Sequence, residues 1–181
     1  MTDEQARDET VTLFLAGHET TANALNWAWL LLAQHPDVEA KLHAELDTVL
    51  GGRLPTLADL DHLPYTEMVV KETLRLYPPA WGFGRLAIED VELAGYTVPQ
   101  GSSVGILSYL THRHPAYWDE PERFNPERFS PENESQRHKY AYIPFGGGAR
   151  ICIGNSFAMM EARLILATVA SRFRLRLMPG Q

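Results

Sequence analysis

A single cysteine stands in a glycine-rich segment whose residue types suit a metal-binding thiolate. Cys152 lies in FGGGARICIG, residues 145–154, directly before a predicted helix. The N–H groups at a helix start stabilise a thiolate, and flanking glycines let backbone N–H groups approach the sulfur. Phe145 can shield the sulfur from water, and Arg150 can pair with an anionic group of a cofactor. The segment therefore favours Cys152 as a metal ligand.

Three other interpretations of this cysteine compete. A nucleophilic cysteine needs a partner histidine, and none of the seven histidines stands in a recognisable signature beside it. A phosphate-binding loop would continue as G-K-[ST], whereas here Ala149 and Arg150 follow the glycines. A buried structural thiol is the usual role of an isolated cysteine. The ten-residue pattern favours the metal ligand over all three.

The same segment resembles the haem-ligand signature of the cytochrome P450 family. Phe145, Gly148, Arg150, Cys152 and Gly154 match its F-x-x-G-x-R-x-C-x-G spacing, and three further segments match family motifs in the family's order. In this family a cysteine thiolate is the proximal ligand of the haem iron. The resemblance therefore implies haem b (iron protoporphyrin IX) as the cofactor, Cys152 as the iron ligand and Arg150 as a partner of a haem propionate.

The segment AGHETT, residues 16–21, resembles the family's oxygen-activation motif. Ala16 and Gly17 would leave a low helix surface against which O2 and substrate can lie. Thr20 would offer a hydroxyl for proton transfer, and Glu19 would supply the protons. On its own, the segment would more simply indicate a Gly/Thr kink with the Thr20 hydroxyl bonded back to a backbone carbonyl.

Glu72 and Arg75 stand three residues apart in KETLR and share one face of a predicted helix. An isolated pair of this kind is usually a surface salt bridge worth about 0–1 kcal/mol. Here RLYPP follows at once, and PERF at 126–129 supplies Arg128, as in the family. The resemblance implies a partly buried Glu72–Arg75–Arg128 network that braces the chain beneath the haem loop, a structural rather than a catalytic role.

The loop after this helix holds further candidates. Arg85 follows YPPAWGFG, where many family members place an arginine that reaches a haem propionate. By the same resemblance Ala80 and Trp81 would border the substrate space, and packing within the loop is their simpler alternative. His112 and His114 receive no role, because exposed or locally bonded histidines are the expected reading.

The elements that must position these residues are mostly helical. Thr2 and Gln5 form a capping-box pattern that opens a helix, His35-Pro36 ends it, and Gly17 is expected to interrupt it. Further helices are expected over 36–50, 65–76 and 155–172, short strands over 84–108, and an irregular segment over 114–144. The predicted fold class is mainly α with small β-sheets, an incomplete cytochrome P450 fold.

The charges are unevenly distributed along the chain. The chain carries 16 basic and 23 acidic side chains, a formal net charge of −7, which argues against a general nucleic-acid binder. Residues 137–181 nevertheless hold seven basic side chains and one acidic residue, Glu161. Scatter around a helix is the simpler alternative, but the resemblance implies a basic proximal face that receives an acidic ferredoxin or flavin reductase domain. The candidates for this face are Arg137, Lys139, Arg163, Arg172, Arg174 and Arg176.

The function that the resemblance implies is a haem-dependent monooxygenase. It would insert one atom of O2 into a small apolar organic substrate, with electrons from NAD(P)H through a redox partner. Complete family domains are much longer, so residues 1–181 are expected to be the carboxyl-terminal part of a single domain whose amino-terminal part is absent. A catalytically silent fragment, or an interaction module that retains the scaffold, is the alternative, and a cysteine hydrolase is a third.

The composition bears on where the protein resides and on which cysteine-based sites it can form. One cysteine excludes an internal disulfide framework and any Cys-rich zinc site. The start MTDEQARDET lacks the basic and apolar regions of a signal peptide, and no segment offers about 18 uninterrupted apolar residues. Membrane association is therefore not expected for this chain, and a cytoplasmic location is the default expectation.

Overall fold

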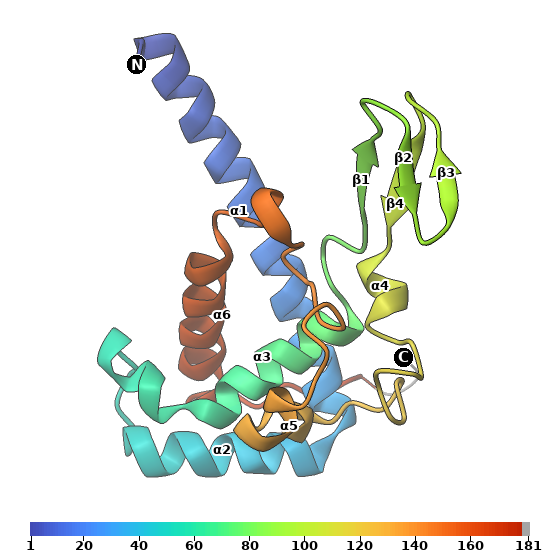
Figure 1. Cartoon of the computed structure of the whole chain (residues 1–181). Coiled ribbons are helices and arrows are strands. Elements are labelled where there is room, and N and C mark those ends of the chain that lie inside the picture. The colour runs from blue at the N-terminus through green and yellow to red at the C-terminus, as the bar shows by residue number, and fades with distance from the viewer. Residues whose placement is uncertain (179–181) are drawn as a thin grey trace.

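The computed structural model describes residues 1–178 and leaves residues 179–181 outside its description. The described chain is mainly helical with two small antiparallel sheets, which confirms the predicted fold class (Figure 1). Its longer helices are α1 (Asp3–Gln34), α2 (Pro36–Leu50), α3 (Pro64–Leu76) and α6 (Asn155–Ala170). Shorter helical segments are η1 (Leu57–His62), α4 (Ser108–Thr111), η2 (Pro126–Phe129), α5 (Pro131–Ser135) and η3 (Gly148–Arg150).

The helix ends follow from local chemistry. The Thr2 hydroxyl accepts from the Gln5 N–H at 3.2 Å, and the Gln5 side chain accepts from the Thr2 N–H at 2.9 Å, so the predicted capping box is confirmed. Pro36 separates α1 from α2, and Gly51 ends α2 in a left-handed conformation with φ of 56°. These three signals fix the first two helices from residues within one turn of each end.

Gly17 does not interrupt α1, which is continuous over 32 residues, so that prediction is wrong. Single glycines are tolerated inside a helix at a cost of about 1 kcal/mol relative to alanine. A Cβ built on Gly17 would meet no atom within 4 Å, so open space surrounds this position. The glycine therefore leaves a low surface on an intact helix.

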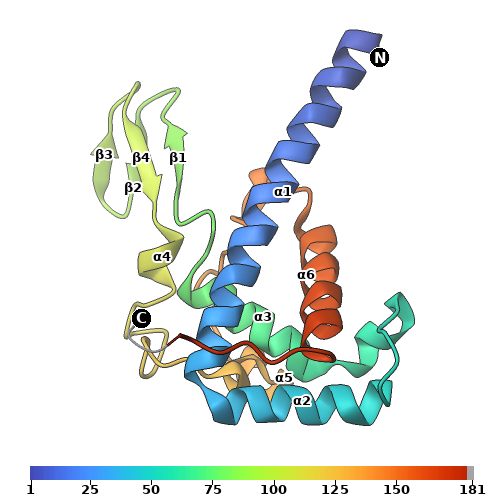
Figure 2. The same cartoon turned by 180° about the vertical axis from the view of Figure 1, so that it is seen from behind.

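The core lies where α1, α2, α3 and α6 meet (Figure 2). On α2 the side chains of Val38, Leu42, Leu46 and Leu50 recur at helical spacing and are buried. Leu166 of α6 is fully buried in the same cluster. Burial of each such leucine contributes about 1.5–3 kcal/mol relative to an exposed one. The four helices form a rigid base for the segments that carry the candidate site.

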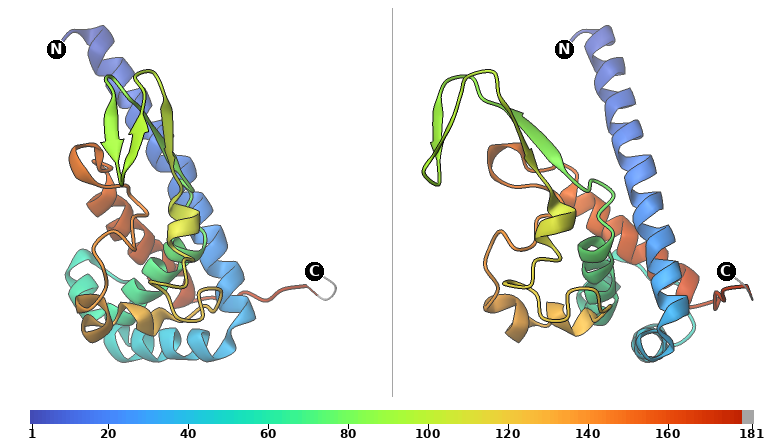
Figure 3. Two further views of the ribbon diagram at one scale, coloured as in Figure 1. Left: turned by 45° about the vertical axis from the view of Figure 1, so that its right-hand side comes forward. Right: turned by 90° about the vertical axis from the view of Figure 1, so that its right-hand side faces the viewer.

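The two halves of α1 have different surroundings. Its carboxyl-terminal half packs into the core, and its buried residues begin at Thr21. Its amino-terminal half projects beyond the other helices, as both views in Figure 3 show. Leu13, Phe14 and Leu15 there are more than 60% exposed. The long helix is therefore anchored at one end only.

A ring stack anchors that carboxyl-terminal half near the end of α3. Trp27 of α1 lies parallel to Tyr77, with ring centroids 4.0 Å apart and an interplanar angle of 6°. The Arg113 guanidinium lies over the same tyrosine ring at 5.5 Å. Aromatic pairs of this kind add about 0.5–1.5 kcal/mol to the area they bury. The stack fixes the position of α1 relative to the segment that follows α3.

The sheets stand away from the helices, as the right-hand view in Figure 3 shows. Strand β1 (Phe83–Leu86) pairs with β4 (Ser103–Ile106), and β2 (Val91–Leu93) pairs with β3 (Tyr96–Val98). Ala94 and Gly95 connect the second pair with φ of 50° and 86°, the left-handed pair that a tight hairpin turn requires. The strands lie within the predicted range 84–108 except for Phe83, with which β1 begins one residue earlier.

A small second core holds the irregular segment between β4 and α6. Trp118, Phe129 and Ala141 are buried together, and the Trp118 indole N–H donates to the Ala141 carbonyl at 3.2 Å. The segment is ordered without long helices, as predicted, although α5 forms a short helix within it. This second core holds the segment that runs up to the Cys152 loop.

Candidate active site

A cavity of about 990 Å³ lies between α1, the loop after α3 and the segment around Cys152. Its lining is largely apolar and includes Leu74, Pro79 and Phe157. It also brings together nine of the residues that the sequence singled out, although they lie far apart along the chain. These are Ala16, Gly17, Thr20, Ala80, Arg85, Phe145, Arg150, Cys152 and Gly154.

Cys152 presents a free thiol at the wall of this cavity. Its N–H donates to the Phe145 carbonyl at 2.9 Å, which closes the loop before α6. A Cβ on Gly154 would lie 3.8 Å from the sulfur, so the backbone passes close to it without contact strain. Gly148 has φ of 69° and lies outside the cavity lining, so it shapes the loop and does not form its wall.

The opposite wall belongs to α1. Ala16, Gly17 and Thr20 face the cavity, and the Thr20 hydroxyl donates to the Ala16 carbonyl at 2.7 Å. This bond is the helix back-bond expected of a threonine inside a helix. The hydroxyl oxygen keeps its lone pairs for a further donor. Glu19 is exposed and lies outside the cavity lining, so the structure does not bring its carboxylate to the thiol.

Two arginines line the otherwise apolar cavity. Arg85 stacks its guanidinium over the Phe83 ring at 5.2 Å and donates from Nη1 to the Gly84 carbonyl at 2.8 Å. Arg150 is exposed on the thiol side. Trp81, which was expected to border the same space, is 64% exposed and lies outside the lining. The cavity thus combines one thiol, apolar walls and two cations.

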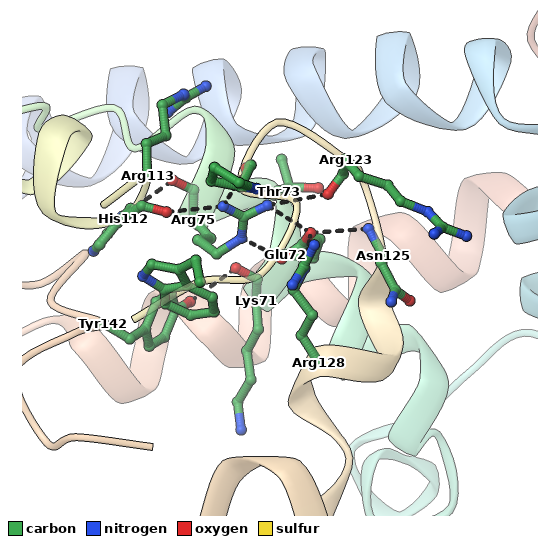
Figure 4. A network of polar contacts seen from close by, with 12 residues as sticks. Lys71, Glu72, Thr73, Arg75, His112, Arg113, Arg123, Asn125, Arg128 and Tyr142 are labelled. Carbon is green, nitrogen blue, oxygen red and sulfur yellow. Dashed lines mark hydrogen bonds and ion pairs between the residues drawn. The ribbon is translucent and has the colours of Figure 1, made fainter. Parts of the chain in front are cut away.

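A fully buried ion pair lies at the carboxyl-terminal end of α3, where the intervening Leu74 lines the cavity (Figure 4). Arg75 donates to both carboxylate oxygens of Glu72, from Nε at 2.7 Å and from Nη2 at 2.9 Å. Arg128 lies alongside, with its Nε 3.5 Å from Glu72 Oε1. The structure brings the three predicted residues together, and both members of the central pair are 0% exposed.

The same pair also forms hydrogen bonds with backbone groups of the irregular segment. Arg75 donates to the carbonyls of His112 at 2.8 Å, Pro121 at 2.7 Å and Arg123 at 3.2 Å. Glu72 Oε1 accepts from the Asn125 N–H at 2.9 Å. Charged groups out of water require such bonds to offset their desolvation. The network therefore connects α3 to four residues between positions 112 and 125.

His112 is the residue whose importance the sequence did not reveal. It is 0% exposed, with Nδ1 3.1 Å from the Arg75 carbonyl and Nε2 2.8 Å from the Ile143 N–H. Its partners lie more than 30 residues away in each direction, so no local pattern could have identified them. Burial, together with the neighbouring positive charges of Arg75 and Arg113, lowers the pKa of His112 to about 4.

This histidine should make stability depend on pH. The unfolded chain protonates near pH 6.5, whereas the folded protein resists protonation down to about pH 4. The unfolded state therefore binds more protons across this window, and stability falls as pH falls through it. We expect a loss of about 3 kcal/mol between pH 7 and pH 4, measured by urea unfolding. The His112→Gln variant should show a flatter pH dependence, and parallel curves would contradict the assignment.

Comparisons with known proteins agree with these observations. A family model described as Cytochrome P450 matches residues 1–181. The chain belongs to the cytochrome P450 family. Its relatives include cyclooctatin synthase of Streptomyces melanosporofaciens, which is 51% identical over 180 residues. Cytochrome P450 4V2 of Homo sapiens is 47% identical over 175 residues, and pentalenene oxygenase of Streptomyces avermitilis is 42% identical over 177 residues.

Each match covers nearly all of this P450 chain but only part of the relative. The matches cover 96–99% of this chain, and 39%, 33% and 39% of the three relatives in the order given. The chain thus spans about two fifths or less of the length of the curated relatives it matches.

Membership of the P450 family implies haem, and the cavity fits that group chemically. Within residues 1–178 no three His, Cys, Asp or Glu side chains cluster to hold a metal ion. A single thiol at the wall of an apolar cavity suits a metal that brings its remaining ligands with it, as iron in a porphyrin does. The apolar walls suit the macrocycle, and Arg85 and Arg150 suit its two carboxylates.

The expected basic face of this P450 chain needs correction, because three of its arginines are engaged within the fold. Arg163 Nη1 lies 2.9 Å from Glu67 with a side chain only 14% exposed, and Arg176 Nη1 lies 2.8 Å from Glu39. Arg137 is half-buried over the Trp118 ring at 4.4 Å. A charge total cannot reveal these pairings, so the sequence overestimated the free positive charge.

The remaining three basic residues are exposed but separated. Lys139 precedes Tyr140, whose ring would lie 3.4 Å from a Cβ on Gly147 of the Cys152 loop. Arg172 and Arg174 follow the far end of α6. That helix has 16 residues and spans about 24 Å at 1.5 Å per residue. Of the three, only Lys139 stands next to a contact with the thiol loop.

No helix within residues 1–178 combines the length and the apolar character that crossing a membrane requires.

Proposed function

We propose that this chain is the carboxyl-terminal part of a P450 domain that inserts one atom of O2 into an apolar organic substrate. Electrons would come from NAD(P)H through a redox partner. The observation that carries the proposal is the single cavity that Cys152 and the Gly17–Thr20 face of α1 share. A thiol on one wall and a small-residue helix surface on the other suit a flat cofactor with room for a small ligand above it.

Each residue of the cavity has a distinct task in this proposal. A bound haem would supply the iron chemistry that activates O2. Cys152, whose side chain is exposed at the cavity wall, would provide the thiolate. Arg85 and Arg150 would pair with the haem carboxylates and fix its orientation.

The α1 wall would lie on the substrate side of the cofactor. Ala16 and Gly17 leave space above the cofactor plane, since no atom lies within 4 Å of a Cβ on Gly17. Thr20 Oγ1 can accept or donate a proton at the cavity surface by rotating away from the Ala16 carbonyl. Glu19 lies outside the cavity lining, so proton supply from its carboxylate would have to pass through water.

The apolar lining supports an apolar substrate, which Ala80 would border. Relatives named for cyclooctat-9-en-7-ol and for pentalenene agree with this class. Trp81 lies outside the cavity lining, so a contact between Trp81 and substrate would need the loop to move.

The test of the proposed function is the spectrum of the full chain after incubation with haem. Thiolate ligation predicts a red-shifted Soret band in the reduced carbon monoxide complex, at a stoichiometry of one haem per chain. An unshifted band, or no haem retained after gel filtration, would contradict the proposal. That outcome would favour a catalytically silent fragment, for which the exposed apolar residues of α1 provide the supporting observation.

An acidic ferredoxin or flavin reductase domain is the proposed electron donor, and it would dock beside Lys139. Lys139→Glu is expected to slow the first electron transfer several-fold at low salt, and added salt should shrink the difference. Arg172→Glu is the matched control, because Arg172 lies beyond the far end of α6. Stopped-flow reduction would measure both variants. Equal effects of the two reversals would reject a docking site local to the Cys152 loop.

A further inference from the structure

His112 links two parts of the molecule that are far apart in the sequence. It caps the carboxyl-terminal end of α4 and is fully buried. One ring nitrogen faces the Arg75 carbonyl at the end of α3, and the other faces the Ile143 N–H just before the Cys152 loop. Neither contact belongs to the cavity, so haem binding alone does not explain them.

The partners of His112 determine its protonation state. A carbonyl can only accept, so Nδ1 must carry a hydrogen toward Arg75. A backbone N–H can only donate, so Nε2 must be an unprotonated acceptor for Ile143. The ring is therefore a neutral imidazole with its proton on Nδ1, and it bridges one acceptor and one donor. A second proton, on Nε2, would place that N–H against the Ile143 N–H, so that two donors would face each other.

The bond to Ile143 holds the first residue of a hydrogen-bonded path to the thiol. The Ile143 carbonyl accepts from the Gly146 N–H at 3.0 Å, in a turn where Gly146 has φ of 75°. The Phe145 carbonyl then accepts from the Cys152 N–H at 2.9 Å. The Cys152 carbonyl in turn accepts from the Asn155 N–H at 3.4 Å, so the loop is held between Ile143 at one end and the start of α6 at the other.

The bond to Arg75 is one of a reciprocal pair. His112 donates from Nδ1 to the Arg75 carbonyl, and Arg75 donates from Nη1 to the His112 carbonyl at 2.8 Å (Figure 4). Arg75 is itself fixed by both oxygens of Glu72. The imidazole therefore connects the buried ion pair to the residue that begins the thiol loop, next to Tyr142, whose hydroxyl donates to the Lys71 carbonyl at 3.0 Å.

We propose that His112 is a positioning residue that fixes the Cys152 loop to the buried Glu72–Arg75 pair through its neutral, Nδ1-protonated ring. The inference rests on the proposed function only for the role given to Cys152 as a ligand. The ring does not touch the cavity; it acts on the thiol through Ile143 and the loop.

Two matched variants separate the two bonds. In His112→Gln the longer side chain can place Oε1 near the position of Nε2 and accept from Ile143. In His112→Asn the shorter amide can still donate to the Arg75 carbonyl but cannot reach Ile143. We expect the Ile143 and Cys152 amides to exchange about tenfold faster in the Asn variant and near the wild-type rate in the Gln variant.

The single cysteine supplies a second readout of the same loop. Alkylation of Cys152 should change in rate in the Asn variant and be restored in the Gln variant, with no other thiol to interfere. Amides of α2 serve as the internal control, since they lie in the helical core. Unchanged exchange at Ile143 in the Asn variant, or equal acceleration throughout α2, would overturn the proposal.

The wild-type tautomer provides a test that needs no substitution. The ¹⁵N chemical shifts of the His112 ring should identify Nδ1 as the protonated nitrogen, and a proton on Nε2 would overturn the inference even if the Asn variant fails to fold. The carbon monoxide spectrum reports haem ligation separately. A loop fixed by His112 without a thiolate band would contradict the proposed function alone. A thiolate band with unaffected exchange would contradict the role of His112 alone.

Discussion

Replacing Arg75 with methionine is expected to lower the free energy of unfolding by about 3–5 kcal/mol. Methionine keeps much of the side-chain volume but leaves the Glu72 carboxylate without its bidentate partner at 0% exposure. Three backbone carbonyls, those of His112, Pro121 and Arg123, lose their donor as well. Urea denaturation followed by circular dichroism would measure the change.

Two controls make this result specific to a buried charge. Lys41→Met removes one partner of the exposed Lys41–Glu127 pair and should cost only about 0–1 kcal/mol. The double variant Glu72→Gln, Arg75→Met removes the stranded charge, so it should be destabilised by less than the sum of the single effects. An Arg75→Met protein within 1 kcal/mol of the wild type would show that water reaches Glu72.

Replacing Cys152 with serine is expected to abolish the red-shifted band of the reduced carbon monoxide complex. A serine hydroxyl stays protonated near neutral pH and is a much poorer ligand for haem iron than a thiolate. The substitution leaves the loop intact, because the backbone N–H of residue 152 still donates to the Phe145 carbonyl. Absorption spectra of the two proteins at equal haem loading would measure the effect.

The matched control for that result is Ile151→Ala. Ile151 adjoins the thiol in sequence but lies outside the cavity lining, so the variant should keep the red-shifted band. Retention of the band in Cys152→Ser would show that another group ligates the iron. Loss of the band in both variants would indicate that the loop as a whole, and not the sulfur, had been disturbed.

Local signals in the sequence were sufficient for the helix ends and for the thiol loop. The Thr2–Gln5 capping box, Pro36 and Gly51 each act within one turn of a helix end, so their effects follow from neighbouring residues alone. The spacing around Cys152 is equally local. The predicted interruption of α1 at Gly17 is wrong. The sequence alone does not distinguish a glycine that leaves space on an intact helix from one that breaks the helix.

Local sequence patterns do not predict contacts between segments that are distant along the chain. His112 received no role from its neighbours, because its partners Arg75 and Ile143 are brought to it only by the fold. Arg163 was counted as a free cation, although the fold places it against Glu67. Composition counts charges but not pairs, and only the three-dimensional arrangement shows which cations remain exposed.

The long-range bonds around Arg75 also bear on the order in which the protein folds. Its three carbonyl partners lie 37, 46 and 48 residues further along the chain. Closing loops of that length costs chain entropy before the new contacts repay it, so these bonds form after the local helices. The Cys152 loop depends on His112, and therefore on that late step. We expect a cofactor to bind the Cys152 thiol only in the last stage of folding, when the helices have already formed.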